Sequence, residues 1–176
     1  PKAALGGVSA KTLKRTLSQQ LEAGRRQFIC LPLFLGPSRA ITEYLPEIVR
    51  DFRRQYPDMQ LEIADSLAGA DSELPDIRLA KMLAKKVLEC VTDCRCHLPK
   101  VALVDHGTPY LPVNRVRNRV AEQLRLELGA HVATVCASSM ERREGAAYDF
   151  NEPLLERLGA CDGMRGGELI LAMFFL

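Results

Sequence analysis

Helix-like and strand-like hydrophobic patterns alternate along the chain. Apolar residues spaced by three or four predict helices, and short continuous apolar runs predict strands covered on both faces. The patterns predict helices over residues 9–23, 41–55, 77–92, 113–128 and 153–158, and strands over 28–35, 61–64, 101–105, 131–137 and 169–176. This alternation favours an α/β fold of right-handed βαβ units, with parallel sheets that carry helices on both faces.

A duplicated unit is indicated when residues 28–35 are set against 169–176 without a gap. Leu17 of the preceding helix then faces Leu158, so the same helix-then-strand unit occurs twice. We therefore interpret the chain as the later half of a first unit, residues 1–96, followed by the earlier half of a second, residues 97–176.

Composition narrows the class of protein. The chain has 176 residues, of which 47% are hydrophobic and 26% charged, as expected for a globular protein rather than a disordered one. Its formal charge of +2 comes from 24 basic and 22 acidic residues that are scattered along the chain, and it contains no Trp. These features argue against nucleic acid as a partner.

The length of the apolar runs and the spacing of the cysteines indicate the cellular compartment. No apolar run reaches the roughly 18 residues of a transmembrane helix, so no membrane association is expected. Six irregularly spaced cysteines favour reduced thiols over a disulfide framework. We therefore expect a cytoplasmic protein.

Three segments carry a resemblance to a known family. They are residues 101–108 (VALVDHGT), 148–154 (YDFNEPL) and 31–40 (LPLFLGPSRA), the last followed by Tyr44-Leu45-Pro46. In this spacing they resemble the opening strand with its His-Gly turn, the Glu-Pro segment, and the strand with its Pro-Gly-Arg-His turn of the class II chelatases, the CbiX and SirB type. The resemblance implies two flavodoxin-like (chelatase-like) halves that face each other across a cleft.

The resemblance also implies an activity: insertion of a divalent metal ion (cobalt, iron or nickel) into a sirohydrochlorin-type tetrapyrrole, as in cobalamin or siroheme biosynthesis. By resemblance, His106 is the metal ligand, and Glu152 is the acid or base that handles the pyrrole protons. Neutral imidazole suits such borderline ions, and a carboxylate can accept protons. Each residue has a structural alternative: His106 as a cap or packed side chain, and Glu152 as part of the first turn of a helix.

The first unit departs from the family pattern. Ala40 occupies the slot of the turn histidine and cannot coordinate a metal, and the corresponding position of the second unit lies beyond Leu176. Arg39 remains in the turn, where it could bind a carboxylate of an acidic tetrapyrrole. A solvated surface arginine is the alternative.

Other candidate features have structural alternatives. Cys90, Cys94, Cys96 and His97 could form a metal site, but their spacing matches no standard zinc or iron–sulfur motif. Arginines at 115, 117, 119, 142 and 143 could attract substrate carboxylates, or form a solvated helix face. Residues 140–147 are a candidate loop over the cleft.

Two other functions stay open. The first is a non-catalytic tetrapyrrole- or metal-binding protein descended from a chelatase. The second is a flavodoxin-like domain for a nucleotide or flavin. Because no glycine-rich phosphate motif occurs, no nucleotide is expected. A homodimer is also left open.

Overall fold

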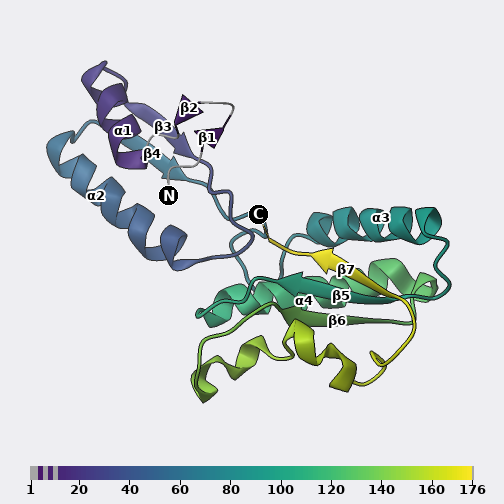
Figure 1. The fold of residues 1–176 in the computed structure, drawn as a ribbon. Coiled ribbons are helices and arrows are strands. Elements are labelled where there is room, and N and C mark those ends of the chain that lie inside the picture. Colours follow the sequence, from purple (N-terminus) through teal and green to yellow (C-terminus); the bar gives the residue numbers. More distant parts are fainter. Residues whose placement is uncertain (1–3, 6–7, 10–11, 176) are drawn as a thin grey trace. The chain divides into compact units, whose positions relative to one another are not determined.

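The computed structural model describes residues 4–5, 8–9 and 12–175 of the chain, and Figure 1 traces them in sequence order. They fall into two compact units. The first unit comprises residues 1–31 and 40–64, and the second comprises residues 32–39 and 65–176. The proposed repeat boundary between residues 96 and 97 concerns the origin of the chain rather than its compactness, and stays a prediction.

The first unit contains a small parallel sheet with two helices. Its elements are β1 (Ala4–Leu5), β2 (Val8–Ser9), α1 (Leu13–Glu22), β3 (Gln27–Cys30), a π-helical turn (Ala40–Tyr44), α2 (Leu45–Gln55) and β4 (Gln60–Ile63). β1 and β2 pair antiparallel, whereas β3 and β4 pair in parallel with Gln27 opposite Gln60. Leucines 17 and 21 of α1 are buried against Val49 and Leu61, as their spacing predicted.

The second unit is built around a three-stranded parallel sheet. Its elements are α3 (Ile77–Asp93), β5 (Lys100–Asp105), α4 (Leu111–Leu128), β6 (Thr134–Ser139), β7 (Leu169–Met173) and 3₁₀ helices at Gly129–His131, Ala146–Asn151 and Leu155–Ala160. The strand order is β6-β5-β7, and both pairings are parallel. Asp76 caps α3 by accepting a hydrogen bond from the Arg78 amide, and Pro112 lies in the first turn of α4.

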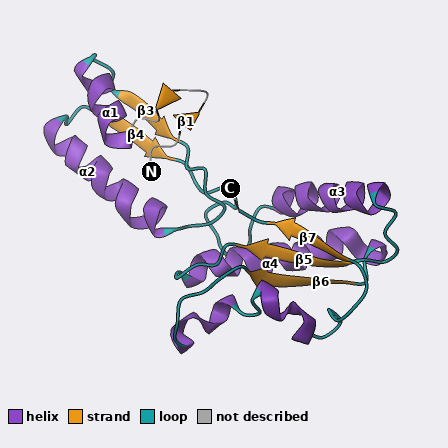
Figure 2. Cartoon of the chain, in the orientation of Figure 1, coloured by secondary structure: helices purple, strands orange, loops and turns teal. Residues whose placement is uncertain are grey.

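Both faces of this sheet are covered, as Figure 2 shows for the elements around β5. Val101 and Leu103 of β5 belong to a core with buried residues of α3 and α4. The alternate residues Ala102 and Val104 pack on the opposite face with Leu158 and Met164. The predicted parallel sheet with helices on both faces is therefore confirmed for this unit.

The apolar run at 28–35 is the clearest departure from prediction. The strand ends at Cys30, and Ile29 and Leu31 are 72% and 71% exposed rather than covered on both faces. Pro32 explains the early end because it has no N–H to donate to a strand partner. Among the described residues, the core cluster of this unit includes Phe28 and Cys30 but neither Ile29 nor Leu31, so it packs on one face of the run.

Other element boundaries shift by a few residues. The predicted helix at 153–158 is a 3₁₀ helix at Leu155–Ala160, and the strand predicted at 131–137 spans Thr134–Ser139. α4 begins two residues earlier than predicted, at its Leu-Pro pair. The first predicted helix begins only at Leu13, and Ser9 lies in β2 instead. Ala10 and Lys11 of that prediction, and Leu176 of the last predicted strand, lie outside the described residues.

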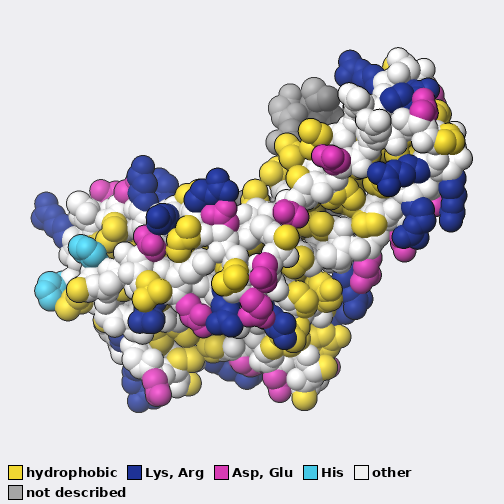
Figure 3. Space-filling view, turned by 180° about the vertical axis from the view of Figure 1, so that it is seen from behind, with side chains coloured by type: hydrophobic (Ala, Val, Ile, Leu, Met, Phe, Trp, Pro, Cys, Tyr) yellow, Lys and Arg dark blue, Asp and Glu magenta, His cyan; other side chains and the backbone are white. Residues whose placement is uncertain are grey.

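The surface carries charges of both signs. Figure 3 shows basic and acidic side chains interspersed on the face turned to the viewer, as the scattered charges of the sequence predicted.

Within the described ranges, the structure has no helix with the length and apolar character that a bilayer crossing requires.

Candidate functional site

The His-Gly turn directly follows the carboxyl end of β5, where ligands of open α/β sheets bind. Gly107 has φ of +96°, and a Cβ at this position would lie 1.9 Å from the carbonyl oxygen of Glu141. Its amide donates a hydrogen bond of 3.1 Å to Asp105 Oδ1. Only glycine combines this backbone conformation with this close approach, so the residue type is required for His106 to leave the strand as it does.

Backbone hydrogen bonds continue beyond β5 and β6 and bring a second polar residue to His106. The amide of Met140 donates to the carbonyl of Asp105 (2.9 Å), and that of Glu141 donates to the carbonyl of His106 (3.2 Å). As a result, His106 Nδ1 lies 3.7 Å from Glu141 Oε1. Both side chains are about two-thirds exposed, at 67% and 72%, so they are open to a ligand from solvent.

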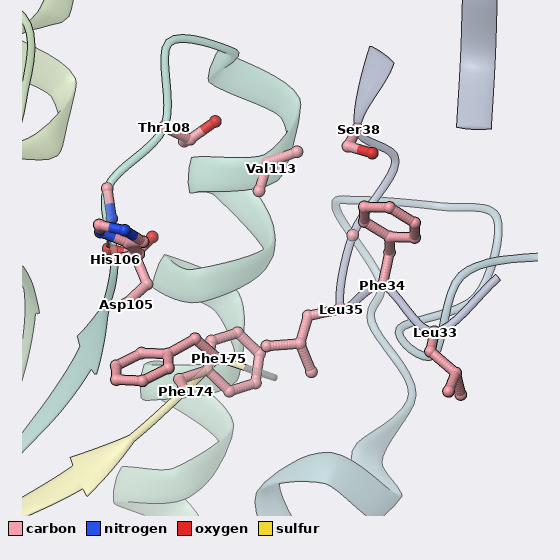
Figure 4. A pocket seen from close by; sticks show the side chains of 12 residues that line it. Leu33, Phe34, Leu35, Ser38, Asp105, His106, Thr108, Val113, Phe174 and Phe175 are labelled. Atoms are coloured by element: carbon pink, nitrogen blue, oxygen red, sulfur yellow. Dashed lines mark hydrogen bonds between the residues drawn. The ribbon is translucent and has the colours of Figure 1, made fainter. Parts of the chain in front are cut away.

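A pocket of about 220 Å³ opens beside His106. Figure 4 shows His106, Asp105 and Thr108 on one side of it and Phe34, Leu35 and Ser38 on the other, with Phe174 and Phe175 near the end of β7. The Phe175 ring centroid lies 6.4 Å from that of His106. The pocket thus combines apolar walls with one imidazole at its rim, a composition common to ligand sites.

The second predicted motif, the turn at 31–40, forms the far wall of this pocket. The amides of Leu67 and Ala68 donate to the carbonyls of Phe34 and Leu35, at 2.9 and 3.0 Å, which fixes the extended chain. Gly36 is buried, and a Cβ there would lie 3.2 Å from Val116 of α4. This glycine therefore lets the turn lie close against α4, which brings two motifs that are far apart in the sequence to one pocket.

Arg39 is exposed, and its guanidinium lies 5.5 Å from the ring centroid of Tyr110. This distance is within the range of a cation–π interaction. Tyr110 closes the same loop as His106, and its amide donates to Thr108 Oγ1 at 3.1 Å. The predicted substrate-binding arginine is therefore held over the loop that carries the predicted metal ligand.

A buried ion pair lies beneath the exposed rim. Arg117 of α4 is 1% exposed, and its Nη1 is 3.5 Å from Asp105 Oδ1. Burial lowers the pKa of the Arg117 guanidinium, and the neighbouring Asp105 carboxylate opposes that shift. Nη1 also donates to the Ser139 hydroxyl and to the Asn151 carbonyl, the latter at 3.2 Å.

This arrangement corrects the interpretation of Arg117 as part of a solvated face or as an attractor of substrate carboxylates. Arg115 and Arg119 do lie on the surface, where both pair with Glu73. Successive residues of a helix are about 100° apart, so position 117 points away from 115 and 119, toward the side that carries Leu124. Sequence spacing could therefore have revealed the buried position.

Glu152 occupies a different part of the same sheet edge. Its Oε1 accepts hydrogen bonds from Arg142 (2.9 Å) and Arg157 (3.3 Å), and its Oε2 accepts one from the amide of Leu154 (3.0 Å). Glu152 is not among the residues that line the pocket, whereas His106 is. The structure thus brings together His106 and the turn at 33–38. It also places Glu141, which the sequence analysis did not single out, 3.7 Å from His106. The assigned roles of His106, Glu152 and Arg39 stay predictions.

The cysteine cluster does not form a complete metal site. Cys90 Sγ and Cys94 Sγ lie 4.0 Å apart, and the amide of His97 donates to Glu168. Among the residues that the structure describes, no three or more His, Cys, Asp or Glu side chains gather as a metal-binding group. His106 and Glu141 are a pair of such side chains, and a metal bound by two protein ligands would keep coordination positions open.

Part of the chain matches a known protein family. Residues 2–85 match the model of the CbiX family, a segment that contains the turn at 31–40 but ends before His106. No curated protein sequence matches the chain.

Two solved structures are similar in fold. The structure of SirB from Bacillus subtilis with Fe3+ matches with a TM-score of 0.64 and 15% identity over 93% of this chain. The sirohydrochlorin chelatase SirB from Bacillus subtilis subspecies spizizenii in complex with cobalt matches with a TM-score of 0.54 and 15% identity over 94% of this chain. The chain spans 58% and 69% of the lengths of these two proteins.

Proposed function

We propose that this chain, whose residues 2–85 belong to the CbiX family, takes part in the insertion of a divalent metal ion into a sirohydrochlorin-type tetrapyrrole. The observation that carries the proposal is the pair of His106 Nδ1 and Glu141 Oε1, which lie 3.7 Å apart, with His106 among the residues that line an apolar pocket. The cobalt named for one SirB structure supports this class of metal, and the other structure names iron in its trivalent form.

The spacing of the pair suits a shared metal ion. Bonds of about 2.1 Å at the tetrahedral angle place two ligand atoms about 3.4 Å apart, so a small side-chain rotation suffices. Neutral imidazole binds Co²⁺, Fe²⁺ or Ni²⁺ well, and the open coordination positions let the ion leave for the macrocycle. The metal is therefore substrate, held at His106 until the ring nitrogens replace the protein ligands.

Proton removal is assigned to a carboxylate. Insertion requires the loss of two pyrrole N–H protons. Glu141, whose side chain is 72% exposed beside the metal ligand, would accept one proton, release it to solvent and then accept the second. Glu152, with two arginine partners, is the alternative base. Neither carboxylate lines the pocket, and Glu141 is preferred because its Oε1 lies 3.7 Å from His106 Nδ1.

The ring of the substrate would lie against the apolar walls. The pocket is smaller than the roughly 300–1,000 Å³ of sites that enclose a whole ligand, so it would cover one part of a macrocycle. Phe34 and Phe175 would contact the ring face, and Arg39 would pair with a peripheral carboxylate. The finer fold prediction, two flavodoxin-like halves with the ring in a cleft between them, forms part of this proposal.

A second function is favoured by Ala40. Because the family turn has a histidine where this chain has Ala40, a non-catalytic tetrapyrrole- or metal-binding protein would keep His106 and the pocket without turnover. The six free cysteines fit a reducing compartment, and we propose a cytoplasmic site of action for either function.

Replacing His106 by alanine tests the proposal. Wild type should bind Co²⁺. His106→Ala should weaken binding by about tenfold or more, because the remaining carboxylate is a poor site alone. The measurement is a Co²⁺ titration followed by visible absorbance. His131→Ala removes an exposed imidazole from a 3₁₀ turn before β6 and is the matched control, with unchanged affinity.

An insertion assay on two glutamine variants decides whether Glu141 or Glu152 is the base. Sirohydrochlorin and Co²⁺ are mixed with each protein, and the absorbance change gives the rate. Glu141→Gln should slow insertion by about a hundredfold, the scale of general base catalysis, and slow it more than Glu152→Gln does. The reverse order would move the base to Glu152. Metal binding without insertion by wild type would favour the binding protein, and the absence of both would reject the proposed site.

A further inference from the structure

His106 and Glu141, here called the rim pair, each follow closely in sequence a residue that the buried Arg117 guanidinium contacts. Asp105, which precedes His106, accepts a hydrogen bond at Oδ1 from the Ser139 hydroxyl (2.5 Å) and lies 3.5 Å from Arg117. Ser139, two residues before Glu141, also receives a hydrogen bond from Arg117. The same guanidinium thus contacts both strand ends that carry the exposed pair.

A third segment, residues 150–151, also binds the Arg117 guanidinium. Arg117 donates to the carbonyls of Phe150 and Asn151, at 3.3 and 3.2 Å. The Asn151 side chain in turn accepts from the amide of Thr108 (3.0 Å) and donates to the Thr108 carbonyl (2.9 Å), which fixes the loop after the His-Gly turn. Asn151 is fully buried, so these contacts are shielded from water.

We propose that Arg117 is a positioning residue that sets the separation of His106 and Glu141, and through it the metal affinity of the rim. The inference rests on the proposed function for its metal, but the coupling of the two side chains can be measured without one. Arg117 touches neither His106 nor Glu141 in the hydrogen bonds and ion pairs of the described residues, and acts through Asp105 and Ser139.

The planar guanidinium explains why arginine is needed. Its three nitrogens serve at least four oxygen acceptors, on Asn118, Ser139, Phe150 and Asn151, while its charge balances Asp105. Lysine would keep the charge, but a single ammonium has three donors and no fork, so it cannot hold all of these groups. Arg117→Lys therefore separates the charge from the geometry.

A matched control lies on the same helix. Arg119 pairs with Glu73 at 2.9 Å and with Glu122 at 3.0 Å and is about half exposed. Arg119→Lys makes the same chemical change two residues away, where long side chains can adjust in solvent. It should leave the rim unaffected.

The metal-free test measures coupling between His106 and Glu141 by NMR of the imidazole ring. The chain has three histidines, and His106→Ala identifies the relevant signal. In wild type and in Arg119→Lys, adding Glu141→Gln should shift the His106 signal. In Arg117→Lys the same substitution should produce no further shift, because the two side chains no longer lie together. An equal response in all three backgrounds would overturn the proposal.

Metal affinity gives the second readout. Arg117→Lys should weaken Co²⁺ binding by about tenfold or more, as loss of supporting residues does, whereas Arg119→Lys should stay within about twofold. If Arg117→Lys does not unfold cooperatively, Ser139→Ala replaces it, since it keeps the ion pair and removes one link. The same loss of coupling is then expected, and intact coupling would reject the proposal. If wild type binds no Co²⁺, the proposed function fails, while the NMR comparison still decides the role of Arg117.

Discussion

Asp105→Asn is expected to lower the free energy of unfolding by about 3–5 kcal/mol, the usual cost of removing one partner from a buried ion pair. The substitution keeps the size of the side chain, so it leaves no cavity. It removes only the charge that balances Arg117, whose side chain is 2% exposed. The guanidinium would then remain in the interior without a counter-charge.

Urea unfolding followed by far-UV circular dichroism measures this loss. Glu122→Gln is the control, because Glu122 forms an ion pair of 3.0 Å with Arg119 at the surface of the same unit. Its loss should cost less than about 1 kcal/mol. Removing both charges, with Asp105→Asn and Arg117→Met together, should recover part of the stability. If Asp105→Asn costs no more than Glu122→Gln, the buried pair contributes little and the account of this network is wrong.

Gly107→Ala is expected to cost about 3 kcal/mol of stability and to disrupt metal binding as well. A positive φ costs a residue with a side chain about 1–2 kcal/mol. Relief of the overlap between the new Cβ and the Glu141 carbonyl, 1.9 Å away, costs about 1–3 kcal/mol more. The backbone must move apart where the ends of β5 and β6 meet, so His106 and Glu141 separate.

Gly166→Ala isolates the conformational part of this cost. Gly166 lies in the same unit with φ of +64°, and a Cβ added there would have no neighbouring atom within 4 Å. It should lose only about 1–2 kcal/mol and keep its Co²⁺ affinity. If Gly107→Ala and Gly166→Ala lost equal stability, separating the ends of β5 and β6 would cost no free energy of unfolding. Unchanged Co²⁺ affinity in Gly107→Ala would show that the rim does not depend on this turn.

Local patterns were sufficient to predict most elements of the sheet and its helices. The apolar run of β5 predicted a strand buried on both faces, and five of its six residues are buried. The run at 28–35 has a similar pattern but is only partly a strand, because Pro32 interrupts pairing, and Ile29 and Leu31 are exposed outside the core cluster of the described residues. The amount of cover over a strand depends on the rest of the fold and is not encoded in the run itself.

The candidate site was predicted only in part for the same reason. His106 is a candidate from its position after a strand and from the family resemblance, and its role stays a prediction. Glu141 was missed because its closeness to His106 depends on the register of β5 against β6, which pairs Asp105 with Ser139. The rule that carboxyl ends of parallel strands meet at one edge could have flagged Glu141 from the sequence, once that strand was placed two residues later.

The buried Arg117 guanidinium and its partners also limit which substitutions the second unit can accept during evolution. Asp105, Arg117, Ser139 and Asn151 come from four separate segments, yet each satisfies a buried group of another. A single replacement leaves a charge or donor unpaired, whereas a concerted one can restore the balance. We therefore expect these four positions to be inherited or exchanged as a set, while exposed neighbours such as Arg115 and Arg119 vary independently.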